Sequence, residues 1–261
     1  MLTWGVFAFL IKKAFFDLWD NLLRIVILNL GYIVAGALII YPPYLFKSVP
    51  VLFFLSFFLG LLILCAYTGA VSGMVRQIAD YQQPEARQFV SLLKASLPTS
   101  VLFALLNAAL FLLLNIAFPV YQAMRSLVGS VASSFLFWFL VLWILAGQFF
   151  YPIQSQLDRR FGKMLKKMFL LLLDNPLFSI GLFLGVLFIL AVSLFTALLL
   201  PGISAAMLWL NVGLKLRLYK YDYLEKNPEG RKTIPWDALL VTDRERVGKR
   251  TLKGMIFPWK E

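Results

Sequence analysis

Six long apolar segments constrain the fold of this chain more than any other feature of its sequence. A helix needs roughly 20 apolar residues to cross a hydrocarbon core of about 30 Å. Most of the six segments reach that length; the last is short and has Lys215 near its end, where a long basic side chain can extend to the membrane surface. The sequence therefore predicts an all-α, polytopic integral membrane protein with six transmembrane helices. The predicted spans are 21–42, 49–74, 99–121, 128–153, 177–200 and 203–216.

Composition supports a lipid environment and excludes a soluble protein. Hydrophobic residues make up 61% of the 261 residues and charged residues 15%, against roughly 45–50% and 25% in soluble proteins. A soluble globule of this size has too little interior to bury that much apolar surface. The hydrophobic side chains are therefore expected to face lipid as well as a protein core.

Positive charges are distributed unevenly among the loops that join the predicted spans. Of the 25 Lys and Arg residues, 23 fall at the start of the chain, between spans two and three, between spans four and five, or after residue 214. Only Lys47 and Arg125 fall in the other loops. Because cytoplasmic loops of membrane proteins carry an excess of Lys and Arg, this distribution predicts that both termini are cytoplasmic.

Three stretches of the chain share one pattern, in which a short amphipathic helix is followed by a polar turn and the start of a span. Aligning Asp20, Ser96 and Asp174 gives spacings of 76 and 78 residues. The pattern predicts three membrane hairpins, each preceded by an interfacial elbow helix. A threefold duplication is one interpretation, and amphipathic helices that precede unrelated hairpins are the other.

These boundaries divide the chain into three parts. The parts are an interfacial N-terminal helix at 1–20, a six-helix membrane domain at 21–216 and a basic cytoplasmic tail at 217–261. In the first part, Trp4 and Trp19 are expected at the level of the lipid headgroups. Lys12 and Lys13 are expected to face anionic lipid on the cytoplasmic side.

Residues that carry catalysis or bind metals are scarce. The chain has no His, which is the commonest general base and metal ligand, and Cys65 is its only Cys. No Asp, Glu or Lys occupies the middle of a predicted span, where proton relays and coupled transporters place such residues. We therefore predict no enzyme activity, no catalytic residue, no metal and no cofactor.

Uncharged polar residues and glycines inside the spans are predicted to hold the helices together. Amide side chains can form hydrogen bonds between helices, each worth roughly 0.6–2 kcal/mol in a membrane. A substrate path lined by the same amides is the alternative. Glycines four residues apart allow two helices to approach closely. The predicted packing residues are Asn29, Asn107, Asn115 and Gln148, with the glycine pairs Gly69–Gly73 and Gly181–Gly185.

The cytoplasmic loops and the tail form the predicted contact surface for lipid headgroups or for another protein. Their basic residues follow the inner face of the membrane, so anionic lipid or an acidic partner accounts for the net charge of +12 without nucleic acid. Two Trp residues of the tail have the side chain that often anchors protein interfaces. The predicted contact residues are Arg76, Arg87, Lys94, Arg159, Arg160, Lys163, Trp236 and Trp259.

Two stretches of the sequence resemble a known family. The segment FFDLWDNLLRIVILNLGYIVAGALI is similar to the opening of the YesL-like family of bacterial polytopic membrane proteins. The segment AYTGAVSGMVRQIADYQQPEARQFVSLLKASLPTSVLFALL is similar to the block that follows it in that family. The resemblance implies a helical protein of the bacterial cytoplasmic (inner) membrane. It also implies a gene often found beside carbohydrate ABC importers, an accessory role and no established enzymatic activity.

These observations lead to two hypotheses about function. The first is a non-enzymatic accessory or scaffold subunit of a membrane transport assembly, a bacterial carbohydrate ABC importer, in contact with the ABC permease subunits. The second is a permease-type transport subunit, because SLLKASLPTSV resembles the end of the coupling loop of ABC permeases. The Glu-Ala-Ala start of that motif is missing here. A lipid-modifying enzyme is a third class, and the spans lack the clustered nucleophile and base that it would need.

Overall fold

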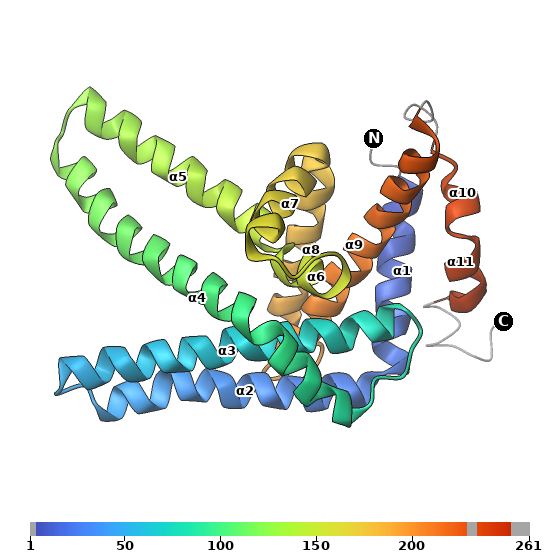
Figure 1. The fold of residues 1–261 in the computed structure, drawn as a ribbon, viewed down its shortest axis with the longest axis horizontal. Coiled ribbons are helices and arrows are strands. Elements are labelled where there is room, and N and C mark those ends of the chain that lie inside the picture. Colours follow the sequence, from blue (N-terminus) through green and yellow to red (C-terminus); the bar gives the residue numbers. More distant parts are fainter. Residues whose placement is uncertain (1–3, 229–233, 252–261) are drawn as a thin grey trace.

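The computed structural model describes residues 4–228 and 234–251, and all regular secondary structure in these two ranges is helical (Figure 1). The prediction of an all-α fold is confirmed. The helices are α1 (Trp4–Asp20), α2 (Leu22–Leu45), α3 (Pro50–Ala79), α4 (Ala86–Ala123), α5 (Leu127–Gly147), α6 (Phe150–Gln156), α7 (Phe161–Asp174), α8 (Pro176–Leu194), α9 (Gly202–Lys226), α10 (Trp236–Leu239) and α11 (Val241–Val247).

Five of the described helical segments are long and apolar enough to cross a membrane. They are α2, α3, α4, α5 together with α6 (Leu127–Gln156), and α8. The predicted sixth span, 203–216, lies in α9, which is not among the five. The second half of α9 carries Lys215, Arg217, Lys220 and Lys226, and its first half lies among other helices rather than on a lipid-facing surface. The fold is that of a membrane-embedded polytopic protein.

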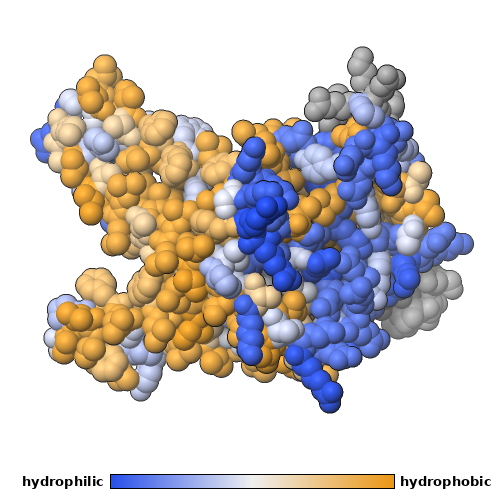
Figure 2. All heavy atoms as spheres, in the orientation of Figure 1, coloured by the Kyte–Doolittle hydropathy of each residue, from blue (hydrophilic) through white to orange (hydrophobic). Residues whose placement is uncertain are grey.

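Two helical hairpins project from the rest of the molecule and diverge (Figure 1). The first arm is α2 with α3, and the second arm is α4 with α5. Within each arm a glycine brings the helices together: Gly60 lies against the backbone of Leu38, and Gly129 lies against the carbonyl of Tyr121. Apolar residues cover both arms, and polar residues gather at the opposite end of the molecule (Figure 2).

The arms pack on each other only near their base. Between Pro50 and Cys65, Gly60 is the one α3 residue that is buried within the described chain, whereas most residues from Ala66 to Ala79 are buried. In α4, burial within the same part of the chain is confined to positions between Ser96 and Ala104. The outer halves of the arms therefore lack a protein neighbour, among the described residues, beyond their own hairpin partner.

The core lies at the base of the arms and is built around α9. Every residue from Ser204 to Leu214 is buried, and α9 contacts α1, α2, α3, α6 and α8. A helix enclosed by protein can include polar side chains such as Asn211 because neighbouring helices satisfy their hydrogen bonds. This enclosure explains why α9 is less apolar than the helices that face lipid.

Two of the three predicted elbow turns are present as helix breaks. The first helix ends at Asp20 and α2 begins at Leu22; α7 ends at Asp174 and α8 begins at Pro176. The third expected turn, near Ser96, is absent because α4 is one continuous helix. Pro98 lies inside α4, where it removes a single backbone donor without ending the helix. The prediction of a separate helix before span three is wrong.

The two ends of the chain fold together. Lys13 lies on the face of α1 that packs against α9 and α11, and its side chain is 0% exposed. The expectation that Lys13 faces lipid is therefore wrong, whereas Trp4 and Trp19 are exposed. The predicted tail boundary at residue 217 lies inside α9, and α11 buries Val247 against the core.

Candidate functional site

A polar pocket lies at the base of the arms, where α3, α4 and α6 meet. Its volume is about 210 Å³, and Gly69 and Gly73 form the α3 side of its lining. A Cβ atom on Gly69 would lie 2.6 Å from the hydroxyl of Ser100, and one on Gly73 would lie 2.9 Å from Leu92. The absent side chains let α4 approach α3 closely and keep the pocket open.

The floor of the pocket contains an amide that is incompletely hydrogen-bonded. Gln154 of α6 is 5% exposed, and its Nε2 donates to the carbonyl of Ser96 at 3.0 Å and to the hydroxyl of Thr99. Its Oε1 has no hydrogen-bond partner within the part of the chain that the structure describes. A buried acceptor without a partner costs about 1–3 kcal/mol, so this amide lowers the stability of the packing beside the pocket.

The mouth of the pocket is basic. Arg76 and Arg159 line it together with Asp80. Nε of Arg76 lies 3.5 Å from a carboxylate oxygen of Asp80, and Nη1 of Arg76 donates to the carbonyl of Ser155. Two guanidinium groups and one carboxylate leave a positive excess, and guanidinium groups bind carboxylates and phosphates in two-pronged geometry. The pocket can therefore accept an anionic group at its mouth.

A second polar layer connects the pocket to α9. Asn211 donates from Nδ2 to the hydroxyl of Ser72 at 3.1 Å. Its Oδ1 accepts from the hydroxyl of Ser155 at 3.0 Å and from Nε2 of Gln156 at 2.9 Å. These bonds join α3, α6 and α9 directly behind the pocket.

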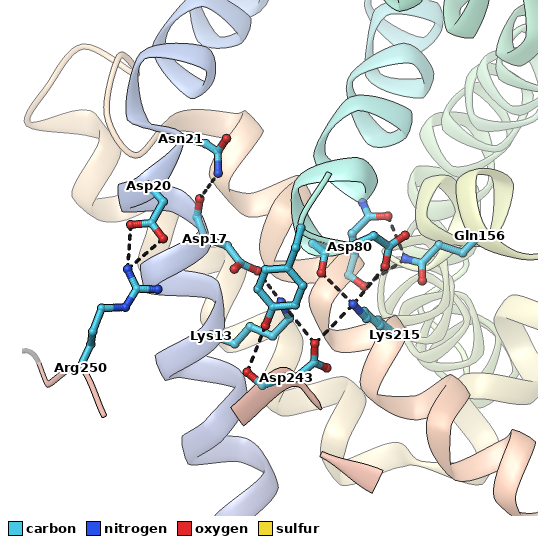
Figure 3. Close-up of polar contacts among 12 residues, drawn as sticks. Lys13, Asp17, Asp20, Asn21, Asp80, Gln156, Lys215, Asp243 and Arg250 are labelled. Atoms are coloured by element: carbon cyan, nitrogen blue, oxygen red, sulfur yellow. Dashed lines mark hydrogen bonds and ion pairs between the residues drawn. The ribbon is translucent and has the colours of Figure 1, made fainter. Parts of the chain in front are cut away.

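A buried charge cluster lies beside the base of the arms and joins four segments (Figure 3). Nζ of Lys13 lies 2.9 Å from Asp17 and 3.9 Å from Asp243. Nζ of Lys215 lies 3.1 Å from Asp80 and 3.5 Å from Asp243. The cluster thus connects α1, the end of α3, α9 and α11. Its two ammonium groups face three carboxylates, and Arg76, whose Nε lies 3.5 Å from Asp80, supplies the third positive charge.

Tyr81 completes the charge cluster. Nζ of Lys13 lies 3.7 Å from the centre of the Tyr81 ring, and the Tyr81 hydroxyl donates to the carbonyl of Asp243 at 3.2 Å. Burial lowers the pKa of Lys13, and burial raises the pKa of Asp17 to about 6 against the opposing effect of Lys13. Because both charges are paired and enclosed, we interpret the cluster as a structural connection between the chain ends rather than a binding site.

The sequence did not single out this cluster or Gln154. Lys13 and Asp17 are four residues apart on an otherwise apolar helix, which was a usable signal for a buried ion pair. Asp243 gave no such signal because it lies 230 residues from Lys13 in sequence.

Of the predicted contact residues, Arg76 and Arg159 come together at the pocket and the others do not. Arg87, Lys94, Arg159, Arg160 and Lys163 are exposed, and we refer to these five as the exposed basic residues. Arg160 pairs with Asp158 at 3.6 Å. Trp236 is half-buried against the core of its own chain, so it is not a free anchor for a partner. Trp259 lies outside the described residues.

Three of the four predicted packing amides connect different segments. Asn29 contacts the α8–α9 turn, Asn107 accepts from Nε1 of Trp143 at 3.0 Å, and Gln148 donates to the carbonyl of Ser179 at 2.9 Å. Asn115 is exposed, and its amide donates only to Phe111 of its own helix among the described residues. The expectation that Asn115 joins two helices is therefore wrong.

The second glycine pair faces two aromatic rings. A Cβ atom on Gly181 would lie 3.0 Å from Phe7 of α1, and one on Gly185 would lie 2.5 Å from Trp209 of α9. The first pair faces α4, so both pairs lie at helix contacts.

Comparison with known proteins adds no assignment. The chain matches no protein-family model, and no curated protein and no solved structure is significantly similar to it. Within residues 4–228 and 234–251, no group of three or more Cys, Asp or Glu side chains is arranged to hold a metal ion. The function is therefore argued from the arms, the pocket and the exposed basic residues.

Proposed function

We propose that this protein is a non-enzymatic accessory or scaffold subunit of a transport assembly in the bacterial cytoplasmic membrane. The observation that carries the proposal is the divergence of the two arms, whose outer halves bury almost nothing on the rest of the described chain. Helices of one membrane protein gain stability by packing on one another. Arms that lack this packing offer two apolar faces to the helices of another membrane subunit.

The proposed orientation follows the charges. We place the turns 46–49 and 124–126 on the outer side of the membrane and the pocket, the charge cluster and the exposed basic residues on the cytoplasmic side. In this orientation α1 and α7 are interfacial elbow helices. The pair α8 and α9 is the third hairpin, and it inserts from the cytoplasmic side.

The proposed partner is an integral membrane subunit with an acidic cytoplasmic surface. The outer halves of the arms carry no Asp or Glu, so apolar transmembrane helices fit beside them. The exposed basic residues lie at the base of the arms, on the proposed cytoplasmic side, and attract acidic side chains. The resemblance of residues 14–121 to the YesL-like family favours the permease of a carbohydrate ABC importer as that subunit.

A permease-type transport subunit is the second candidate. The polar pocket favours it, because a cavity whose lining includes Arg76, Arg159 and Gln154 offers polar groups that could orient a bound ligand. Reconstitution of the chain alone in liposomes tests this candidate, since uptake of labelled oligosaccharide without another subunit would favour transport by this chain.

The accessory role is tested by removing charge from one end of the molecule. The test variant combines Arg159→Gln, Arg160→Gln and Lys163→Gln, and the matched control combines Lys47→Gln and Arg125→Gln at the other end. Membranes are extracted with an amphipathic polymer that retains lipid, and co-purifying membrane proteins are quantified by mass spectrometry.

We expect the wild type and the control to retain one stoichiometric membrane partner. We expect recovery of that partner with the test variant to fall at least tenfold, with an unchanged unfolding temperature. Purification of the wild type without any stoichiometric partner would refute the accessory role. Equal recovery by the test variant and the control would refute the basic contact.

A further inference from the structure

The turn between α8 and α9 is apolar and is attached to the side of α2. Residues 195–201 read FTALLLP and include no charged residue. Asn29 of α2 holds the turn with three hydrogen bonds. Its Nδ2 donates to the carbonyls of Leu199 at 3.0 Å and Pro201 at 2.7 Å, and its Oδ1 accepts from the backbone N–H of Ser204 at 2.8 Å.

The position of Asn29 along α2 sets the depth of this turn. Asn29 is seven residues from the first residue of α2, Leu22, and 16 residues from the last, Leu45. At 1.5 Å per residue, the turn is held about 10 Å from the base of the arm and about 24 Å from its tip. A turn at this depth does not reach the level of the 46–49 turn.

Residues 211–215 of α9 lie between that depth and the base of the arm. Asn211 bonds to Ser72, which is seven residues before the end of α3, and Lys215 bonds to the carbonyl of Ala79 at the end of α3. Phe7 of α1 packs edge-to-face on Trp209, seven residues after the first residue of α9, with ring centres 5.8 Å apart. The first helix, α1, thus contacts the hairpin between its turn and its ends.

The backbone of the turn is hydrogen-bonded as required within hydrocarbon. Inside a bilayer no water is present to pair with free N–H groups, so a non-helical turn there must satisfy them within the protein. The N–H groups from Phe195 to Leu200 each have a protein acceptor, and the Gly202 N–H donates to the hydroxyl of Ser193 at 2.8 Å. The Thr196 hydroxyl forms two hydrogen bonds within the turn. It donates to the carbonyl of Leu200 and accepts from the backbone N–H of Leu200. A loop in water would not need this pairing.

We propose that α8 and α9 form a re-entrant hairpin, which enters the bilayer from the cytoplasmic side, turns inside the hydrocarbon at Asn29 and returns. The distribution of charges does not separate this arrangement from two full crossings, because both leave the ends of the hairpin in the cytoplasm. The re-entrant hairpin also accounts for the unpacked outer halves of the arms, since the hairpin that would complete the bundle stops short of them. That consequence rests on the proposed orientation, whereas the depth relative to α2 does not.

Cysteine labelling tests the depth of the turn in the full-length protein. In a Cys65→Ala background, single variants Phe195→Cys, Lys47→Cys and Gly162→Cys are treated with a membrane-impermeant maleimide. Phe195 is 92% exposed on the protein surface, and a Cβ atom added to Gly162 would meet no atom within 4 Å, so neither change disturbs packing. In intact cells the maleimide reaches only the outer face of the membrane, and in open membrane fragments it reaches both faces.

We expect Lys47→Cys to react in intact cells and Gly162→Cys to react only in open fragments. We expect Phe195→Cys to remain unreactive in both and to react after denaturation in dodecyl sulfate. Labelling of Phe195→Cys in intact cells at the rate of Lys47→Cys would overturn the proposal, as would labelling in open fragments at the rate of Gly162→Cys. The measurement needs no partner subunit, so its outcome is independent of the accessory role.

Discussion

At the scale of single residues, buried polar side chains connect segments that are far apart in the sequence. Asn29 pairs three backbone groups of the α8–α9 turn, and Asn211 joins three helices behind the pocket. Lys13 and Asp243 join the two ends of the chain. Each of these groups is enclosed, so loss of one partner leaves another polar group unpaired in a medium that cannot solvate it.

Asn29 and Asn115 form a matched pair for testing this view. Replacing Asn29 with Leu removes the partner of two carbonyls and one N–H, at about 1–3 kcal/mol for each unpaired group. Asn115 is exposed and, among the described residues, donates only within its own helix. We expect Asn29→Leu to lower the unfolding temperature in detergent by several degrees and Asn115→Leu to leave it unchanged. Equal effects of the two substitutions would contradict the role of Asn29 in holding the turn.

Asp17 makes stability depend on pH in a defined direction. Burial raises its pKa in the folded protein to about 6 from an ordinary value of 3.8. Between these values the folded state binds the proton more tightly than the unfolded state, so the Asp17 contribution to the free energy of unfolding rises as the pH falls from about 7 to about 4. Asp17→Asn removes this contribution. We expect the unfolding temperature of the wild type minus that of the variant to increase over this pH range, and a constant or decreasing difference would contradict the raised pKa.

At the scale of helices, close approach depends on glycines that face large side chains. Gly185 of α8 receives the ring of Trp209, and a Cβ atom there would lie 2.5 Å from it. Gly36 of α2 faces open space, which makes it a control of the same residue type in another apolar helix.

We expect opposite effects from the two alanine substitutions. Gly185→Ala should destabilise the protein by about 1–3 kcal/mol through overpacking, whereas Gly36→Ala should be neutral or stabilise it by up to about 1 kcal/mol through helix propensity. Chemical denaturation in mixed micelles measures both. A tolerated Gly185→Ala would show that α8 and α9 are farther apart than in this structure.

The apolar helices were predictable from sequence, and their tertiary contacts were not. Runs of apolar residues located α2, α3, α4, α5 and α8, and the polar turns marked by Asp20 and Asp174 located two helix breaks. The break expected near Ser96 failed because a proline inside a long apolar helix removes only one hydrogen bond. The depth of the α8–α9 turn could not be predicted, since apolarity is the same for a full crossing and for a re-entrant hairpin.

Four residues of the candidate site were singled out from the sequence, but the site itself was not predicted. Gly69, Gly73, Arg76 and Arg159 were each selected for packing or for contact, and the structure brings them around one pocket. These residues come together because α6 folds back against α3 and α4, and the local sequence does not predict that packing. Gln154 was not selected, because one amide at the end of an apolar segment is common in membrane proteins.

At the scale of the whole molecule, apolar and polar surfaces are separated along its length (Figure 2). The arms form the apolar part, and the core around α9, the charge cluster and the exposed basic residues form the polar part. This separation matches a bilayer around the apolar part and an aqueous phase around the polar part, which in the proposed orientation is the cytoplasm. The outer part of the membrane region is built from two hairpins that do not pack on each other, which is an incomplete bundle in the absence of another subunit.

We propose that a second, different membrane polypeptide completes the bundle beside the arms. Native mass spectrometry of the full-length protein, extracted with its surrounding lipid under gentle conditions, distinguishes this arrangement from a self-sufficient chain. We expect a complex whose mass equals the 29.8 kDa chain plus at least one other membrane subunit in fixed stoichiometry. Detection of the chain only as a monomer, or only in complexes with copies of itself, would contradict the proposal.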